Sequence, residues 1–321
     1  WAMASGRAAR VLDDVSPETI KQFKISNINA GMGTYSVNID RDAFQRNKEN
    51  NYYKLLRKSS SIESYTHNMD EYAYQPKVNF PSVFWQLEPA LRTQIGGPDE
   101  FFLGDLRLQL KTETLITRNF SLVTGTTIGL YDTFDRLKNN ASSLLPQVRT
   151  NIVPYLKESR KVAVERLQFN YFLNSHKNIY SKFSAGIFEE MFGGLGGEII
   201  YKPFASNYGI GAELWRVRQR NFDMRFSFLD YQTTTGHINL YYHEQKSNIL
   251  LEIKGGKFLA GDSGIRFDFS RLFKSNLRIG AFFALTDISK EEFGEGSFDK
   301  GFYFHLPLHV FSEKYEKRKI P

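Results

Sequence analysis

The sequence contains no cysteine, and this absence excludes disulfide bonds, thiolate metal sites and cysteine nucleophiles. It also contains no apolar run that approaches the roughly 18 residues of a helical membrane span. Lysine and arginine outnumber aspartate and glutamate by 42 to 35, but the basic residues are scattered and form no stripe of the kind that binds nucleic acid. We therefore expect neither a transmembrane helix nor a nucleic-acid partner.

Phenylalanine and tyrosine are abundant instead. The 28 Phe and 17 Tyr residues account for most of an aromatic content of 15%, although the mean hydropathy is only -0.41. High aromatic content with low hydropathy suits a transmembrane β-barrel, because only every second residue of each strand faces the membrane. A soluble β-sandwich or lectin-like protein has a similar composition, so composition alone leaves both classes open.

Residues 222–243, FDMRFSFLDYQTTTGHINLYYH, give the clearest alternation in the sequence. Every second residue is apolar at both ends of the stretch, from Phe222 onward and again at Ile238 and Leu240. A period of two predicts β-structure with one apolar and one polar face. The stretch is either one long strand or a hairpin folded at residues 232–236.

The links between alternating segments decide this choice. Further segments of the same kind are residues 84–94, 106–117, 121–133, 162–174, 179–188, 197–204, 208–216, 248–257, 264–270, 276–286 and 301–310. Short links alternate with longer or glycine-rich links, as in membrane barrels, only if residues 222–243 form one strand. Segments of about ten residues also exceed the usual strands of a sandwich. The pattern predicts an antiparallel transmembrane β-barrel with about 12 strands in this chain.

The chain before the barrel has a different character. Ser16-Pro17-Glu18 is a helix start, and two short alternating strands follow around Gly31 and Gly33. We predict a small α/β module over residues 1–50, a polar linker over 51–82, the barrel over 83–311 and a charged tail over 312–321.

Several long segments within residues 189–311 resemble one known family. The segments EEMFGGLGGEIIYKPF, WRVRQRNFD, LDYQTTTGHINLYY, GKFLAGDSG and TDISKEEFGEGSFDKGFYFHLPL are similar, in order and spacing, to the YjbH/GfcD family of exopolysaccharide and capsule biosynthesis proteins. The resemblance implies a Gram-negative outer-membrane β-barrel protein, often a lipoprotein, with the N-terminal module in the periplasm. Family members look like two barrels separated by periplasmic α/β segments. The resemblance therefore implies that this chain lacks the first barrel and the last strands, and we expect its own barrel to be incomplete.

The sequence offers little support for catalysis. Ser263 lies in a GDSG segment, but no histidine motif accompanies it, as a serine nucleophile would require. The glycines of residues 193–197 are followed by no Lys-Ser or Lys-Thr pair, so they predict a tight loop and no phosphate cradle. His305 and His309 would lie about 13 Å apart along a strand, too far to share a metal ion. We predict no enzyme activity, metal or cofactor; an outer-membrane hydrolase and a general porin remain the alternatives.

Three groups of residues are candidates for contact with a polymer. The first is the basic row Arg216, Arg218 and Arg220, which could meet an acidic polysaccharide at a rim. The second is the charged set predicted to face a hydrated lumen, Lys254, Arg266, Asp268 and Arg278. The third lies in the acidic loop of residues 287–300, which is either a sugar contact or a solvated loop: Glu291, Glu292, Phe293, Glu295, Phe298 and Asp299.

These predictions together define an expected function. We expect a part in exopolysaccharide or capsule export, as a polysaccharide conduit or as a scaffold for the export machinery. The expected partners are outer-membrane lipid, an acidic exopolysaccharide and periplasmic polysaccharide-export proteins.

Overall fold

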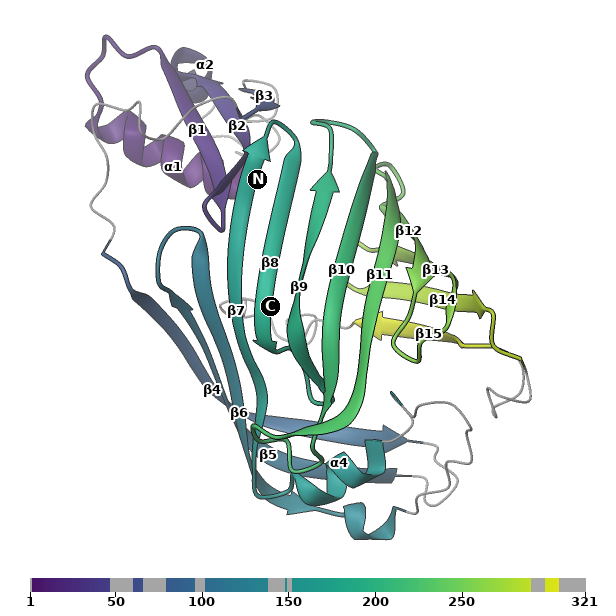
Figure 1. Ribbon diagram of the computed structural model, residues 1–321. Coiled ribbons are helices and arrows are strands. Elements are labelled where there is room, and N and C mark those ends of the chain that lie inside the picture. Colours follow the sequence, from purple (N-terminus) through teal and green to yellow (C-terminus); the bar gives the residue numbers. More distant parts are fainter. Residues whose placement is uncertain are drawn as a thin grey trace.

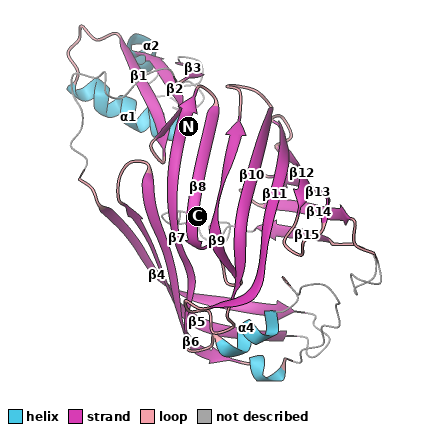
Figure 2. Ribbon diagram, viewed as in Figure 1, coloured by secondary structure: helices cyan, strands magenta, loops and turns pink. Residues whose placement is uncertain are grey.

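The computed structural model describes residues 2–46, 60–65, 79–95, 102–137, 148, 152–289 and 298–305. Within these ranges the protein is mainly β, with one small and one large antiparallel sheet (Figures 1 and 2). None of the described helices combines the length and the apolar character that a membrane crossing requires.

The N-terminal module is a small α/β unit. It consists of α1 (Ala2–Val15), β1 (Gln22–Asn29), β2 (Met32–Asp40), α2 (Arg41–Arg46) and β3 (Ser60–Ser64), with the strands in the order β1-β2-β3. Phe23, Val37, Ile39 and Phe44 form its core together with Ala9 of α1. The third strand lies within the segment predicted as a linker. Its sequence, SSIES, contains a single apolar residue, and sequence periodicity therefore gave no signal for it.

The second unit is a sheet of twelve strands, in agreement with the predicted number. Its strands are β4 (Ser82–Ile95), β5 (Phe102–Leu115), β6 (Phe120–Asp132), β7 (Val162–His176), β8 (Ile179–Ile187), β9 (Phe192–Tyr201), β10 (Tyr208–Arg220), β11 (Phe228–Glu244), β12 (Ile249–Lys257), β13 (Ser263–Leu272), β14 (Arg278–Thr286) and β15 (Lys300–His305). Every strand pairs antiparallel with its neighbours in the chain, and β4 and β15 form the two edges. The sheet is strongly curved but, in the described part of the chain, it is not closed into a barrel (Figure 1).

The long strand is present, but it is shorter than predicted. β11 runs without a turn through residues 232–236, where Gln232 pairs with Arg218 and Gly236 pairs with Leu214, so the hairpin alternative is wrong. Residues 222–227 form a loop instead of the start of this strand. Met224 is fully buried in a cluster at the end of the sheet, and Phe222 packs against the same cluster. These two apolar side chains pack in the cluster and are not part of the strand.

The two faces of the large sheet differ in polarity, and the apolar face is the more exposed one. One face carries a row of paired apolar side chains across neighbouring strands, which is formed by Ile210, Leu240, Ile253, Phe267 and Phe283. This outer face is exposed, and Leu240 retains 47% of its accessible surface. The opposite, inner face carries polar side chains that are buried: the next residue along β11, Asn239, retains 2%. The apolar face is therefore the accessible one.

The two ends of the large sheet also differ. Residues 116–119, 177–178, 202–207, 245–248 and 273–277 form short links at one end, which we call the short-link end. The N-terminal module lies at this end, where β2 contacts β7 and Gly31 lies against Asn119 (Figure 2). The opposite end also has two short links, residues 188–191 and 258–262, but it carries the longer residues 221–227 and the described parts of the link between β6 and β7, with the short helices η2 (Phe134–Arg136) and α4 (Ile152–Glu158).

Candidate functional site

The inner face is a polar surface on the inside of the curved sheet. An ion pair crosses this space between segments that are far apart in the sheet: Arg92 of β4 lies 3.2 Å from Glu190, in the link between β8 and β9. Side chains of alternate residues converge here because the period of a strand is two. The inner face is therefore the candidate functional site.

A cluster of charged and aromatic side chains lies at the centre of this face. Glu213 of β10 faces His237 of β11, and its Oε1 atom lies 2.9 Å from His237 Nδ1 and 2.9 Å from Lys254 Nζ. Trp215 Nε1 donates to the other carboxylate oxygen over 3.2 Å. The His237 ring lies 4.7 Å from the ring of Phe258. Hydrogen-bonding groups and ring surfaces of this kind suit a hydroxylated ligand.

Other inner-face cations are paired with carboxylates too. Lys182 lies 2.9 Å from Glu198, and Lys111 lies 3.3 Å from Glu88. Arg107 is buried between Asp105 and Glu165, and its Nη1 atom lies 2.8 Å from Glu165. Because each of these cations has a carboxylate partner, this part of the face is charge-compensated and is not a basic funnel.

The structure brings together the four residues predicted to face a hydrated interior. Lys254 pairs with Arg266 across β12 and β13, and Asp268 and Arg278 lie on the same inner face of β13 and β14. The guanidinium carbon of Arg266 lies 4.0 Å from the centre of the Phe282 ring. Asp268 accepts a hydrogen bond of 2.7 Å from the Tyr303 hydroxyl.

The structure separates the three arginines that the sequence suggested as one basic row. Arg216 and Arg218 are exposed on the outer face, where they donate to Thr234 Oγ1 over 3.0 Å and to the Leu229 carbonyl over 2.6 Å. Arg220 is fully buried. The pairing register shifts between Arg218 and Arg220, and this shift breaks the alternation that the sequence indicated. A buried guanidinium does not reach a polymer, so Arg220 leaves the candidate contact set.

The structure describes only part of the predicted acidic loop. Glu291, Glu292, Phe293 and Glu295 lie outside the described residues, and their role stays a prediction. The two remaining candidates are described. Asp299 lies 3.6 Å from Arg266, and the Phe298 ring centre lies 4.4 Å from Lys300 Nζ. Asp299 therefore joins the charged groups at the margin of the inner face.

Arg220 instead organises one end of the sheet. Its guanidinium donates to four backbone carbonyls, those of Glu189 at 2.8 Å, Glu190 at 3.1 Å, Val164 at 2.8 Å and Arg225 at 2.9 Å. These carbonyls belong to β7, to the link between β8 and β9, and to the loop before β11. One side chain thus ties three segments together. Sequence reasoning missed this role because backbone acceptors have no residue signature.

The helix α4 crosses the inner face at this end. Leu156 packs in a cluster with Leu103 of β5, whereas the adjacent Tyr155 packs in a cluster with Val217 of β10. Four strands separate β5 from β10 in the sheet, so α4 bridges across its inner side (Figure 1). The Tyr155 hydroxyl donates to the Arg220 carbonyl over 2.6 Å. Burial raises the pKa of Tyr155, so this hydroxyl stays protonated and remains a donor.

The described residues contain no group of three or more His, Asp or Glu side chains that could hold a metal ion. This result concerns only the ranges that the structure describes. The inner face thus offers ion pairs, hydroxyl and amide groups and aromatic rings as its chemical repertoire.

Comparison with known proteins agrees with the sequence resemblance. The family model of YjbH, described as exopolysaccharide biosynthesis protein YbjH, matches residues 1–321. A protein of Escherichia coli K12 described as "uncharacterized lipoprotein YjbH" is 34% identical over 237 residues, which cover 71% of this chain and 33% of the relative. The aligned part is thus about a third of that relative's length. The family match extends over the whole described fold, and the chain belongs to the YjbH family of exopolysaccharide biosynthesis proteins.

Proposed function

We propose that this protein lies in the outer membrane and takes part in exopolysaccharide export, with its outer face against lipid and its inner face toward the polymer. The observation that carries this proposal is the exposure of the apolar face together with the burial of the polar face. Water would favour the reverse arrangement, because burial of apolar surface contributes about 25 cal/mol per Å². In lipid an apolar outer band is the favourable arrangement, and a polar interior is typical of membrane barrels.

The open edges of the sheet support closure in the membrane. β4 and β15 each have one neighbour among the described strands. Unpaired backbone N–H and C=O groups at a sheet edge cost several kcal/mol each in a bilayer, which is why barrels are closed. We therefore propose that the curved sheet is part of a closed transmembrane β-barrel.

The two ends of the sheet support one orientation. Barrels of the outer membrane have short turns on the periplasmic side and longer loops outside. The short links lie on the same side as the N-terminal module, and the link that carries α4 lies on the opposite side. In this proposal the N-terminal module is periplasmic, where it can meet periplasmic polysaccharide-export proteins. The name of the E. coli relative, a lipoprotein, also fits a location in the envelope.

The inner face supports a role as a conduit for polysaccharide. Sugars are bound through hydroxyl groups and through the faces of their rings, and beside the largely buried Glu213–His237 pair the half-buried Trp215 and Lys254 offer an indole and an ammonium group. Paired charges also hold a sliding polymer less tightly than isolated ones, because each cation already has a carboxylate partner. An acidic exopolysaccharide is the proposed cargo.

A second candidate function is a scaffold for the export machinery. The specific observation in its favour is α4, which crosses the inner face and narrows the space there. A scaffold with an obstructed interior would act through the N-terminal module. The hydrolase alternative has less support: Ser263 begins β13, and its backbone N–H donates to the Asp287 carboxylate over 2.8 Å, just beyond the end of β14.

Single-channel conductance of the full-length protein in a planar bilayer separates these proposals. A conduit predicts a steady current that acidic exopolysaccharide blocks, and a weaker block in Arg266→Ala. The matched control is Arg216→Ala, which removes an arginine from the outer face of the sheet. Insertion without current contradicts the conduit and favours the scaffold, whereas current that no polysaccharide affects favours a general porin.

A further inference from the structure

The links at the short-link end share a composition. Each of the five contains a single basic residue, no acidic residue and one asparagine, and the sequence Lys-Ser-Asn occurs in two of them, at residues 246–248 and 274–276. Asn178, Asn248 and Asn276 adopt positive φ angles of 69°, 54° and 64°. Asparagine tolerates this conformation better than most residues, so it fixes the shape of these tight links. A basic side chain is thus presented at a defined place on each link.

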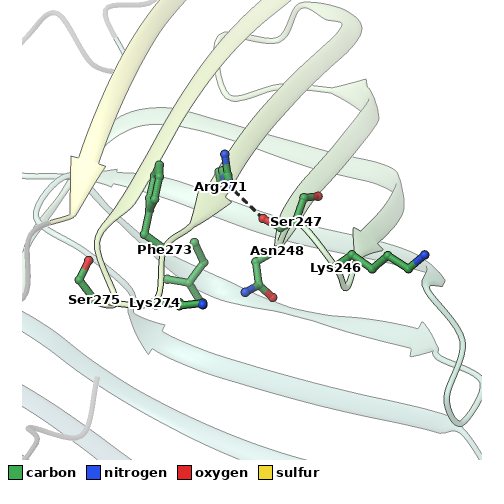
Figure 3. Close-up of a pocket in the computed structure, with 8 residues that line it drawn as sticks. Lys246, Ser247, Asn248, Arg271, Phe273, Lys274 and Ser275 are labelled. Carbon is green, nitrogen blue, oxygen red and sulfur yellow. Dashed lines mark hydrogen bonds between the residues drawn. The ribbon is translucent and has the colours of Figure 1, made fainter.

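Two of these links border an open cavity at the protein surface. The links between β11 and β12 and between β13 and β14 line a cavity of about 400 Å³ together with the end of β13 (Figure 3). Lys246, Arg271 and Lys274 contribute three positive charges to its lining, and Asn248 and Ser275 contribute uncharged polar groups. The cavity therefore carries positive charge, whereas most of its lining surface is apolar.

The three cations of this cavity differ from those of the inner face. Within the described ranges, none of them forms an ion pair with a carboxylate, whereas Lys111, Lys182 and Lys254 all do so. The carboxylate nearest in sequence, Glu244, is engaged at the base of the link. It accepts hydrogen bonds from the backbone N–H of Ser247 over 3.1 Å and from that of Lys246 over 3.3 Å. In the described part of the chain, Glu244 thus bonds to the backbone of the link and forms no ion pair with the three exposed cations.

Arg271 is oriented toward this cavity by its neighbours. Its Nε atom donates to the Ser247 carbonyl over 3.2 Å, and its guanidinium carbon lies 5.0 Å from the centre of the Phe273 ring (Figure 3). These two contacts fix the orientation of the guanidinium plane. Among the described contacts the two terminal nitrogens donate to no other group, so they are available to a ligand. A fixed guanidinium fork matches the oxygens of a phosphate group in a bidentate manner.

We propose that this cavity binds a phosphate group through Arg271 and Lys274, with Lys246, whose side chain extends away from both (Figure 3), at its margin. Two sources share this chemistry: the phosphodiester of an anionic phospholipid headgroup, and free phosphate or a soluble phosphate ester. Arg271 lies at the end of β13 on the outer face, since it pairs with Ile279 and Ile249. The lipid source rests on the proposed membrane location, because only then does this margin meet headgroups. The phosphate chemistry itself does not depend on that location.

The test uses the full-length protein, purified in a neutral detergent and also reconstituted in vesicles of phosphatidylcholine with or without phosphatidylglycerol. Native mass spectrometry measures retained phosphatidylglycerol, and thermal unfolding measures the effect of added inorganic phosphate. The variant Arg271→Gln/Lys274→Gln removes two of the three charges. The matched control, Lys177→Gln, removes the exposed basic residue of a different short link.

The proposal predicts about a tenfold loss of affinity for each charge removed, which corresponds to about 1.4 kcal/mol, because each replacement loses a charge-assisted hydrogen bond. The control should bind like the wild type. Retention of phosphatidylglycerol with no response to inorganic phosphate assigns the cavity to a lipid headgroup. Stabilisation by inorganic phosphate without retention of phosphatidylglycerol assigns it to a free phosphate. Equal binding by the wild type and the double variant, or binding of neither probe, overturns the proposal. The conductance experiment does not depend on this cavity, so the failure of either proposal can be recognised separately.

Discussion

Replacement of Arg220 by methionine should destabilise the end of the sheet that carries α4. The fully buried guanidinium satisfies four carbonyls from three segments, and methionine can satisfy none of them. Hydrogen bonds to a charged group contribute about 1.5–3 kcal/mol each, but four bonds from one group do not add fully. We expect a loss of about 3–5 kcal/mol, the range seen when a buried charged network is broken.

The desolvation cost of the buried Arg220 charge opposes this loss of stability. Removal of a buried charge also removes its desolvation cost, which makes such replacements neutral when the former partners are repacked. Here the partners are backbone carbonyls of β7, of the link between β8 and β9, and of the loop before β11, and they have fixed positions. The loss of hydrogen bonds should therefore outweigh the desolvation gain.

Urea unfolding in micelles measures this effect. Trp215 packs against the cluster at the same end of the sheet, so its fluorescence reports on this region. Arg218→Met is the matched control, because it removes an exposed arginine two residues away. Arg220→Lys should fall between the two, since an ammonium group has three donors on a single nitrogen. The reasoning is refuted if Arg220→Met unfolds at the same urea concentration as Arg218→Met.

Three further predictions follow from individual contacts. Gly256→Ala should cost about 1–3 kcal/mol in thermal unfolding, because Gly256 has a φ of 151° and a Cβ atom there would lie 2.0 Å from the Gly236 carbonyl oxygen. The control is the adjacent Gly255→Ala, which should be close to neutral because the nearest atom to its added Cβ lies 3.9 Å away. Equal effects of the two substitutions would contradict the geometry. Tyr155→Phe removes the hydroxyl that donates to the Arg220 carbonyl and should cost about 1 kcal/mol in urea unfolding, so an unchanged midpoint would mean that this bond adds nothing to the packing of α4. Leu240→Arg should cost about 2–4 kcal/mol in lipid vesicles if the outer face contacts the bilayer centre, whereas an exposed leucine in water tolerates the change within about 0.5 kcal/mol.

Sequence periodicity predicted the strands of the large sheet well, because alternation is a local property. The parity of residues 276–286 places Ile279 and Phe283 on one face and Arg278 on the other, and the structure has the same division. The twelve strands followed from the same signal, whereas the unbroken passage of β11 through residues 232–236 followed from the lengths of the links.

Features that depend on register or on packing at the sheet ends could not be predicted. The pairing of Glu213 with His237 and Lys254 requires the relative positions of three strands, which one sequence does not contain. Phe222 continued the apolar parity of β11, yet it packs against the cluster around α4. Arg220 continued a basic row until a shift in register turned it inward. For Phe222 and Arg220, a local pattern was overridden by a contact with a distant segment.

The central claim is that the apolar face meets lipid while the polar face meets water or polymer. Spin labels introduced one at a time along β14, Arg278–Thr286, in the full-length protein in lipid vesicles test this claim most directly. We expect labels at Ile279, Phe283 and Leu285 to be more accessible to oxygen, which concentrates in the bilayer. Labels at Gly280 and Phe282 should be more accessible to a water-soluble relaxation agent. Accessibility without a period of two along this strand would contradict the proposed membrane orientation.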